Sequence, residues 1–144
     1  MNSTHIARSS ISIDASAQKV WRALVTPDAI KQYMFGTTVV SDWKEGTPIT
    51  WKGEWKGKSY EDKGTIVRVA PERTLAYTHF SPLAGLPDKP DNYHTVTIDL
   101  TADANRTRVA LSQDNNPTAE ARKHSEKNWG QMLAGLKKYV EGSR

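Results

Sequence analysis

Apolar and polar residues alternate at the start of the chain and then take up helical spacing. The alternation in residues 6–13 predicts a strand with one buried face. Over residues 16–25, apolar side chains recur every three or four positions behind a serine that can cap a helix. Residues 26–34 begin with Thr-Pro-Asp, which is typical of a helix N-terminus. We therefore expect one strand followed by two short helices.

The spacing of apolar residues falls to two between residues 37 and 113, which predicts strands. The segments with this period comprise residues 38–41, 49–55, 60–69, 74–81, 93–100 and 106–113. Short turns between successive strands favour an antiparallel meander. Within the third segment, strict alternation places Val67 and Val69 on one face and Ile66 on the other.

Residues 81–92 interrupt this rhythm with prolines, a glycine and only two leucines. Loops of this length without secondary structure are uncommon in compact domains and often act as lids or binding loops. A plain surface connection accounts for the composition equally well. Both interpretations stay open at the level of the sequence.

The C-terminal segment carries the clearest helical signal. Pro117 and Thr118 begin it, and one apolar stripe runs through Ser125, Trp129, Met132, Leu133, Leu136 and Val140. A helix of twenty-odd residues is about 35 Å long, which is enough to cross a small sheet. Its apolar stripe must be buried, and the sheet is the only large partner in the chain.

The order of predicted elements defines the fold class. We expect an α+β protein with a helix-grip fold, in which a curved antiparallel sheet of about six or seven strands surrounds the long C-terminal helix. Two short helices follow the first strand. A curved sheet cannot contact a straight helix along its whole length, so this arrangement commonly leaves a cavity between them. No repeat or linker divides the chain, and we expect residues 1–144 to form a single domain.

The composition supports a folded protein and excludes several kinds of site. Only 37% of the 144 residues are hydrophobic, but 5 Trp, 5 Tyr and 2 Phe supply apolar surface that a disordered chain lacks. The count of 0 Cys excludes disulfides, thiol catalysis, Cys-ligated zinc and iron–sulfur clusters.

Targeting and charge patterns predict a cytoplasmic protein that has no nucleic-acid partner. No apolar run approaches the roughly 18 residues of a membrane span. Residues 1–10 contain no hydrophobic stretch like that of a signal peptide. The formal net charge is +4, but acidic and basic residues alternate even in the densest basic stretch, at 52–63. This alternation is typical of a solvated surface.

No recognisable catalytic pattern occurs in the sequence. It holds no nucleophile elbow, Walker-type glycine loop or zinc-protease motif, and its four histidines are not at metal-ligand spacing. His94 is in register with Val96 and Ile98 and should point inward, either as a hydrogen-bonded core residue or as a general acid–base. Asp62 and Glu54 are carboxylates with no visible partner. We predict no metal ion or other cofactor, and we place a binding role ahead of catalysis.

Aromatic residues mark the space between helix and sheet instead. They occur one or two per predicted element, and filling the core is their usual role. As a set they favour an apolar pocket in which the polar atoms of a few side chains orient a ligand. The candidate cavity residues are Trp21, Trp51, Trp55, Tyr60, Tyr77, Phe80, His94, Val96, Trp129, Met132, Leu133 and Leu136.

Three motifs in order carry a family resemblance. Residues 14–24 (Asp-Ala-Ser-Ala-Gln-Lys-Val-Trp-Arg-Ala-Leu), with Thr-Pro-Asp at 26–28, resemble the opening of the START-like (SRPBCC) superfamily. Residues 64–77 and the Asn-Trp-Gly-Gln-Met-Leu-Ala-Gly-Leu run at 128–136 are similar to the branch related to the activator of the 90-kDa heat-shock protein ATPase, the AHSA-like branch. The resemblance covers nearly the whole chain.

The resemblance implies a helix-grip (START-like, Bet v 1-like) fold with a cavity beneath the C-terminal helix. Superfamily members bind lipids, hormones, polyketides and other apolar molecules, and a few are cyclases or hydratases. The family has no shared catalytic motif, so no catalytic residue is implied here. This sequence has Gly46-Thr47 where relatives often read Gly-Gly, and Tyr33 where a Trp is frequent. The identity of the ligand therefore does not carry over.

Three hypotheses about function follow. The first is a module that binds a small apolar or amphipathic molecule in the cavity. The second is a chaperone-associated or stress-response interaction protein with a chaperone partner. Eukaryotic co-chaperones of this branch carry an additional domain ahead of the START-like one, and this sequence starts at its first strand, so we do not expect ATPase activation. The third is a cavity enzyme of the cyclase or hydratase type.

Overall fold

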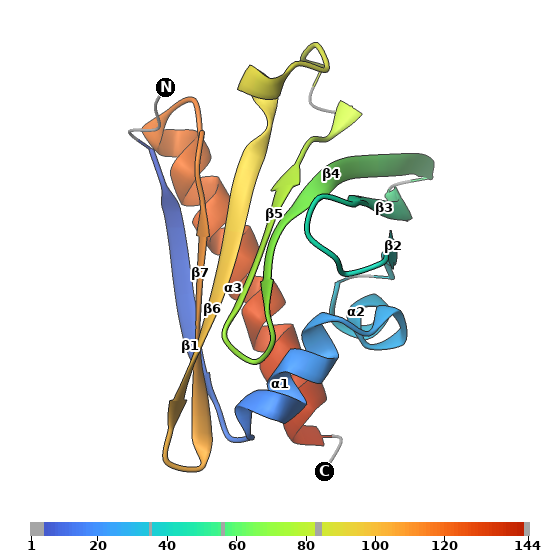
Figure 1. Cartoon of the computed structure of the whole chain (residues 1–144). Helices are drawn as coiled ribbons and strands as arrows, with labels where there is room; N and C mark the ends of the chain where they lie inside the picture. The colour runs from blue at the N-terminus through green and yellow to red at the C-terminus, as the bar shows by residue number, and fades with distance from the viewer. Residues whose placement is uncertain (1–4, 35, 56, 83–84, 143–144) are drawn as a thin grey trace.

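A computed structural model describes residues 5–34, 36–55, 57–82 and 85–142 of the chain (Figure 1). Its strands are β1 (Ala7–Ile13), β2 (Thr38–Ser41), β3 (Pro48–Trp55), β4 (Lys58–Ala70), β5 (Thr74–His79), β6 (His94–Asp103) and β7 (Arg106–Gln113). Its helices are α1 (Ala17–Leu24), α2 (Pro27–Tyr33) and α3 (Ala119–Gly142), together with the 3-10 turn η2 (Pro90–Asn92).

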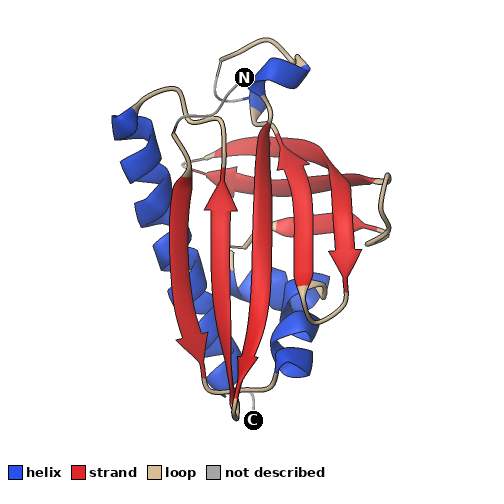
Figure 2. Cartoon of the chain, turned by 60° about the vertical axis from the view of Figure 1, so that its left-hand side comes forward, coloured by secondary structure: helices blue, strands red, loops and turns tan. Residues whose placement is uncertain are grey.

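The described strands form one antiparallel sheet of seven, in the order β1-β7-β6-β5-β4-β3-β2. The sheet is strongly curved: the end formed by β2, β3 and β4 turns across the direction of β1 and β7 (Figure 1). The helices α1, α2 and α3 all lie on one face of it (Figure 2). This arrangement confirms the helix-grip fold, with two short helices after the first strand.

Local sequence signals explain the helix boundaries. The Ser16 hydroxyl accepts a hydrogen bond of 3.2 Å from the backbone N–H of Lys19 and so caps α1. Pro27 occupies the first turn of α2, where its missing N–H costs nothing. None of the described helices is both long and apolar enough to cross a membrane.

A β-bulge in β4 overturns one predicted detail of the sheet. Ile66 pairs with Tyr77, whereas Val69 pairs with Leu75, and the register shifts between them. The extra residue, Val67, is 49% exposed. Ile66 and Val69 therefore both pack against the core, so placing them on opposite faces was wrong. Strict alternation holds only where no residue is inserted.

The core lies between the sheet and the three helices. On α3 the buried stripe consists of Met132, Leu133, Leu136 and Val140. These residues belong to one cluster that includes Ile13, Val20, Ile66, Leu75 and Ile98. Burial of such side chains contributes about 1.5–3 kcal/mol each to folding, which makes this cluster the main source of stability.

Polar side chains of α3 cover the free edge of β1. The Glu126 carboxylate accepts a hydrogen bond of 3.0 Å from the Arg8 backbone N–H. Farther along, Glu141 accepts one of 2.8 Å from the Asp14 N–H, and the Lys137 ammonium donates to the Ser12 carbonyl at 2.9 Å. Backbone groups of an edge strand would otherwise be open to pairing with another chain. These bonds fix α3 alongside β1.

In the described part of the loop at 81–92, side-chain contacts hold the second half of the loop to the sheet. Asp88 forms an ion pair with Lys63 and accepts a hydrogen bond of 2.6 Å from the Tyr93 hydroxyl. The hydrogen bond from Lys63 is the main reason that the pKa of Asp88 is lowered. Phe80 stacks on Tyr93 with ring centroids 5.0 Å apart. The loop is thus anchored to β4.

We predict that Glu126→Ala lowers the free energy of unfolding by about 1 kcal/mol, the usual net value of one hydrogen bond. The hydrogen bond from the Arg8 backbone, followed by the charge of Arg122, lowers the pKa of Glu126. The contribution is therefore complete above the unfolded-state pKa of about 4.3 and is lost as the pH falls through the lower folded-state value. Urea denaturation at pH 7 and at acid pH measures both effects.

The matched control is Lys127→Ala, which removes an exposed side chain from the next position of the same helix. It should leave the unfolding free energy within about 0.5 kcal/mol of the wild type. Equal midpoints for the two variants at pH 7 would contradict the assigned role of Glu126.

Candidate ligand-binding site

A small cavity lies between α3, α2 and the inner face of the sheet. Its volume is about 20 Å³, which is room for about one water molecule. The wall is almost entirely apolar and is formed by Leu24, Ile30, Tyr33, Met34, Val39, Trp43, Ile49, Trp51, Leu75, Tyr77, Ile98 and Met132. The space predicted between helix and sheet is therefore present, but side chains nearly fill it.

Two tyrosines supply the polar atoms of this wall. The Tyr33 hydroxyl donates to the Ala23 carbonyl at 2.9 Å. The Tyr77 hydroxyl has no hydrogen-bond partner among the described residues. Burial raises the pKa of Tyr77, and burial together with the neighbouring Tyr77 and Tyr139 raises that of Tyr33. Both phenols therefore stay neutral, and the Tyr77 hydroxyl remains an available donor.

A strained tryptophan closes one side of the cavity. Trp43 has a φ of 56°, a left-handed backbone conformation that is costly for a bulky residue. Its N–H donates to the Ser41 hydroxyl at 2.9 Å. The segment after it is held to β4, because the Glu45 carboxylate accepts from the Val69 N–H at 3.0 Å. These contacts keep the Trp43 side chain on the cavity wall.

The predicted candidate residues divide into three groups. Trp51, Tyr77 and Met132 line the cavity. A second group fills the core without reaching the cavity and consists of Val96, Leu133 and Leu136. Two more side chains are partly buried against that core: Trp21 and Trp129.

The remaining candidates lie elsewhere. Phe80 is buried against Tyr93 in the loop after β5. The Tyr60 hydroxyl makes a hydrogen bond of 2.8 Å with the Thr37 hydroxyl. Trp55 ends β3, and its side chain lies outside the described residues.

His94 points inward, as its register predicts, but it meets a second histidine there. Its Nδ1 lies 2.9 Å from the Asp114 carbonyl oxygen, and its ring stacks on His79 with centroids 6.4 Å apart. His79 in turn lies 2.9 Å (Nε2 to Oδ2) from Asp62, a carboxylate for which the sequence showed no partner. The His79 and Trp51 rings meet in an edge-to-face arrangement, with centroids 5.0 Å apart. This cluster thus adjoins the cavity through Trp51.

Sequence reasoning missed several of these residues. Trp43 lies in a turn region with no period, so nothing in the pattern marks it as a wall residue. Met34 follows the second helix and is visible only as its last apolar position. The pair of Asp62 and His79 could have been found only from the exact pairing of β4 with β5, which the bulge obscures.

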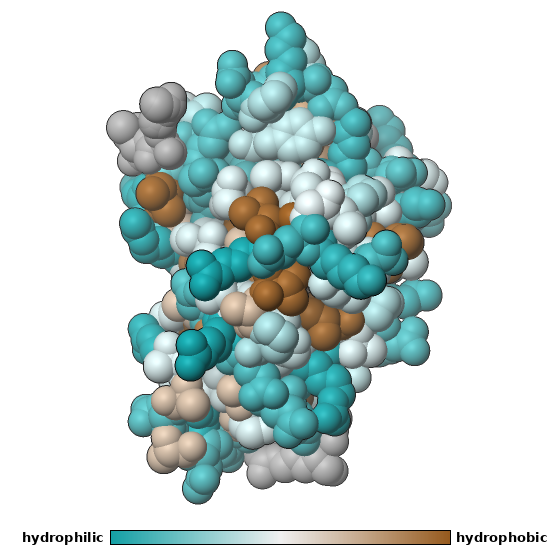
Figure 3. Space-filling model, viewed as in Figure 1, coloured by the Kyte–Doolittle hydropathy of each residue, from teal (hydrophilic) through white to brown (hydrophobic). Residues whose placement is uncertain are grey.

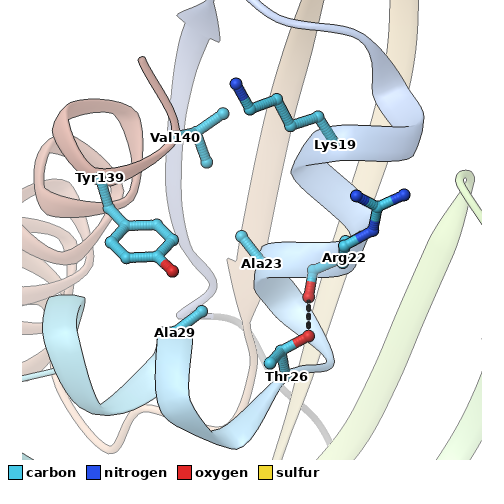
Figure 4. A pocket seen from close by; sticks show the side chains of 7 residues that line it. All are labelled: Lys19, Arg22, Ala23, Thr26, Ala29, Tyr139 and Val140. Carbon is cyan, nitrogen blue, oxygen red and sulfur yellow. Dashed lines mark hydrogen bonds between the residues drawn. The ribbon is translucent and has the colours of Figure 1, made fainter. Parts of the chain in front are cut away.

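A separate surface pocket of about 200 Å³ lies where the three helices meet (Figure 4). The Tyr139 side chain faces Ala29 and Ala23 across it (Figure 4). None of the predicted candidates lines this pocket, whose wall consists of Lys19, Arg22, Ala23, Thr26, Ala29, Tyr139 and Val140.

Comparisons with known proteins agree with this architecture. A family model described as Activator of Hsp90 ATPase homolog 1-like protein matches residues 14–141. The solution structure of ChR145 from Cytophaga hutchinsonii is 59% identical, with 99% of this chain and 98% of that chain covered and a TM-score of 0.86. A search of curated proteins finds no match.

More distant structures share the fold. MLL2253 from Mesorhizobium loti is 21% identical, with 96% of this chain and 98% of that chain covered and a TM-score of 0.78. The Aha1 dimer from Colwellia psychrerythraea is 22% identical, with 94% and 96% covered and a TM-score of 0.73. Together with the family match over most of the sequence, the helix-grip fold shows that this chain belongs to the Activator of Hsp90 ATPase homolog 1-like family of the START-like (SRPBCC) superfamily.

Proposed function

We propose that this START-like domain binds a small, largely apolar ligand in the space between α3 and the sheet. The observation that supports this most directly is the Tyr77 hydroxyl, which lies on an apolar cavity wall without a partner among the described residues. A hydroxyl on an otherwise apolar wall can fix the orientation of a ligand through one hydrogen bond. A ligand with one acceptor oxygen, such as a carbonyl or an ether, supplies the missing partner.

The volume of the cavity sets a condition on this proposal. About 20 Å³ is too little for an organic ligand, so binding requires wall residues to move. Met34 and Met132 are the flexible members of the wall, because an unbranched thioether changes shape at low cost. Trp43 is the third, since leaving its left-handed conformation would relieve backbone strain. The ligand would enter beside these three side chains.

A chaperone partner is the second candidate, and the family description favours it. Large exposed apolar side chains occur at Val40, Val67 and Leu86. On the face in Figure 3, however, polar residues cross the apolar surface and divide it into small patches. Protein interfaces usually need a larger continuous apolar area. We therefore place ligand binding first.

Methionine methyl signals test ligand entry directly. The chain has 3 Met, and two of them, Met34 and Met132, line the cavity. On titration with 2-acetylnaphthalene, an apolar body with one acceptor oxygen, we expect saturable shifts of these two methyl resonances in NMR spectra of ¹³C-methyl-labelled protein. Shifts that grow linearly without saturation, or no shifts at all, would overturn the proposal.

Stiffening the wall tests the role of methionine flexibility. The double substitution Met34→Leu and Met132→Leu keeps the side-chain volume nearly constant but replaces unbranched by branched side chains. We expect the affinity for 2-acetylnaphthalene, followed by tryptophan fluorescence, to fall at least fivefold. Urea denaturation should show a stability change below about 1.5 kcal/mol for each substitution. An unchanged affinity would show that ligand entry does not depend on these side chains.

Tyr77→Phe separates the hydroxyl from the ring. Because the hydroxyl has no partner among the described residues, its removal should leave the free energy of unfolding unchanged or raise it by up to about 1 kcal/mol. The affinity for 2-acetylnaphthalene should fall several-fold, while that for naphthalene, which has no acceptor, should not change. A loss of stability on urea denaturation would mean that the hydroxyl is already paired in the free protein.

The chaperone candidate has its own measurement. When the ¹⁵N-labelled protein is mixed with a purified 90-kDa heat-shock protein and ATP, we expect amide spectra without saturable broadening and an unchanged ATPase rate. Broadening that maps to a contiguous surface would reverse the order of the two candidates.

A further inference from the structure

Two histidine rings on the inner face of the sheet each present a nitrogen that has no hydrogen-bond partner among the described residues. His79 ends β5 and His94 begins β6, and the two are directly paired across these strands. Their rings stack at 6.4 Å, and Trp51 on β3 contacts the His79 ring at 5.0 Å. The side chain of His79 is 29% exposed, so this end of the inner face is open to solvent.

The hydrogen-bond partners settle which nitrogen of each neutral ring is free. A carboxylate only accepts, so the contact of 2.9 Å to Asp62 places the proton of His79 on Nε2. A carbonyl oxygen also only accepts, so the contact of 2.9 Å to Asp114 places the proton of His94 on Nδ1. The Nδ1 of His79 and the Nε2 of His94 are then lone-pair acceptors. Neither has a donor among the described residues.

Asp62 is a positioning residue for the His79 ring, and its own burial lowers the stability of the fold. Its Oδ2 holds the His79 ring, but its Oδ1 is buried and is the one such atom in the described part of the chain that lacks a hydrogen-bond partner. An unpaired buried carboxylate oxygen destabilises the fold. Apolar residues would avoid this cost. The carboxylate gives what they cannot, which is a fixed tautomer of His79.

The site lies next to the proposed ligand space. Trp51 contacts both His79 and Tyr77, with ring centroids 5.0 and 5.1 Å apart. Tyr77 offers a donor, whereas the two histidines offer only acceptors in their neutral forms. An amphipathic molecule lying along Trp51 would therefore meet a hydrogen-bond donor at one end and hydrogen-bond acceptors at the other.

We propose that His79 and His94 anchor the polar head of the ligand, and that this head is a hydrogen-bond donor, a hydroxyl group on an apolar and preferably aromatic body. The inference rests on the proposed function, because it assumes that a ligand occupies the space beside Trp51. It adds the chemical class of the head group and the residues that select it. A carboxylate head is disfavoured, since it would bring lone pairs and negative charge toward the two acceptors and Asp62.

Four naphthalene probes of similar size test the selection. They are 2,3-dihydroxynaphthalene, with two adjacent donors, 2-naphthol, with one, 2-methoxynaphthalene, with none, and 2-naphthoate, an anion. By tryptophan fluorescence at pH 8, we expect 2-naphthol to bind about tenfold more tightly than 2-methoxynaphthalene, as one buried hydrogen bond allows. The dihydroxy compound should bind at least as tightly as 2-naphthol, and 2-naphthoate most weakly.

Imidazole ¹⁵N spectra provide a readout that needs no variant. On addition of 2-naphthol, the Nδ1 signal of His79 and the Nε2 signal of His94 should move upfield, as acceptor nitrogens do when they receive a hydrogen bond. The other two ring nitrogens should stay in place. With 2-methoxynaphthalene none of the four should move by a comparable amount. Unmoved signals with 2-naphthol would overturn the assignment.

His79→Phe keeps a flat ring and removes the acceptor. It should abolish the tenfold preference for 2-naphthol, while the affinity for 2-methoxynaphthalene stays within about twofold. If this variant does not fold, as judged by its amide spectrum, His94→Phe gives the same test. The matched control is His124→Phe, which alters an exposed histidine on α3 and should leave the preference intact.

The outcomes separate the two proposals. Equal binding of 2-naphthol and 2-methoxynaphthalene, with saturable shifts of the Met34 and Met132 methyl signals, would overturn the histidine anchor and leave the proposed function standing. Absence of binding by all four probes and by 2-acetylnaphthalene would overturn both. Tight binding of 2-naphthoate would also overturn the anchor, because it would show a site that selects anions.

Discussion

The contact between α3 and the edge strand β1 is the constraint on which the remaining structure depends. Glu126, Lys137 and Glu141 bond to backbone groups along nearly the full length of β1, and the apolar stripe of α3 faces the core at the same time. The helix is thereby held over one end of the curved sheet. Because a straight helix cannot follow the curve, the backbone of α3 lies close to β1 and β7, and Met132 is the α3 residue on the wall of the cavity in front of β3, β5 and β6.

The inner face of the sheet therefore has two environments, and Trp51 contacts residues of both. On the side of Tyr77, α2 and Trp43 close the face and leave an apolar cavity of about 20 Å³. On the side of His79, the face stays partly open and becomes polar. Trp51 contacts both, and it also pairs directly with Asp62 across β3 and β4. A ligand that spans the ring would experience both environments, which is the physical basis of the selectivity proposed for its head group.

Periodicity predicted the elements because burial on one face dictates spacing. Every strand, both short helices and the stripe on α3 followed from that rule, and so did the inward direction of His94. The wall of the cavity did not follow, since Trp43 reaches it through an unusual φ rather than through a period. The pair of Asp62 and His79 depends on an irregular stretch of the β4–β5 pairing. There Gly64 is required because an added Cβ would overlap the Thr78 carbonyl oxygen.

Two local costs and one unused hydroxyl lie near Trp51. The left-handed Trp43, the unpartnered hydroxyl of Tyr77 and the unpartnered Oδ1 of Asp62 belong to its own surroundings, whereas the core around α3 is apolar and closely packed. A sequence under selection for stability alone could carry glycine at 43 and an apolar residue at 62, and it would lose no hydrogen bond with phenylalanine at 77. Two costs and one unused hydroxyl so close together are more simply explained by a common use. A bound molecule would relieve the hydroxyl, displace the strained tryptophan and engage the histidine that Asp62 orients.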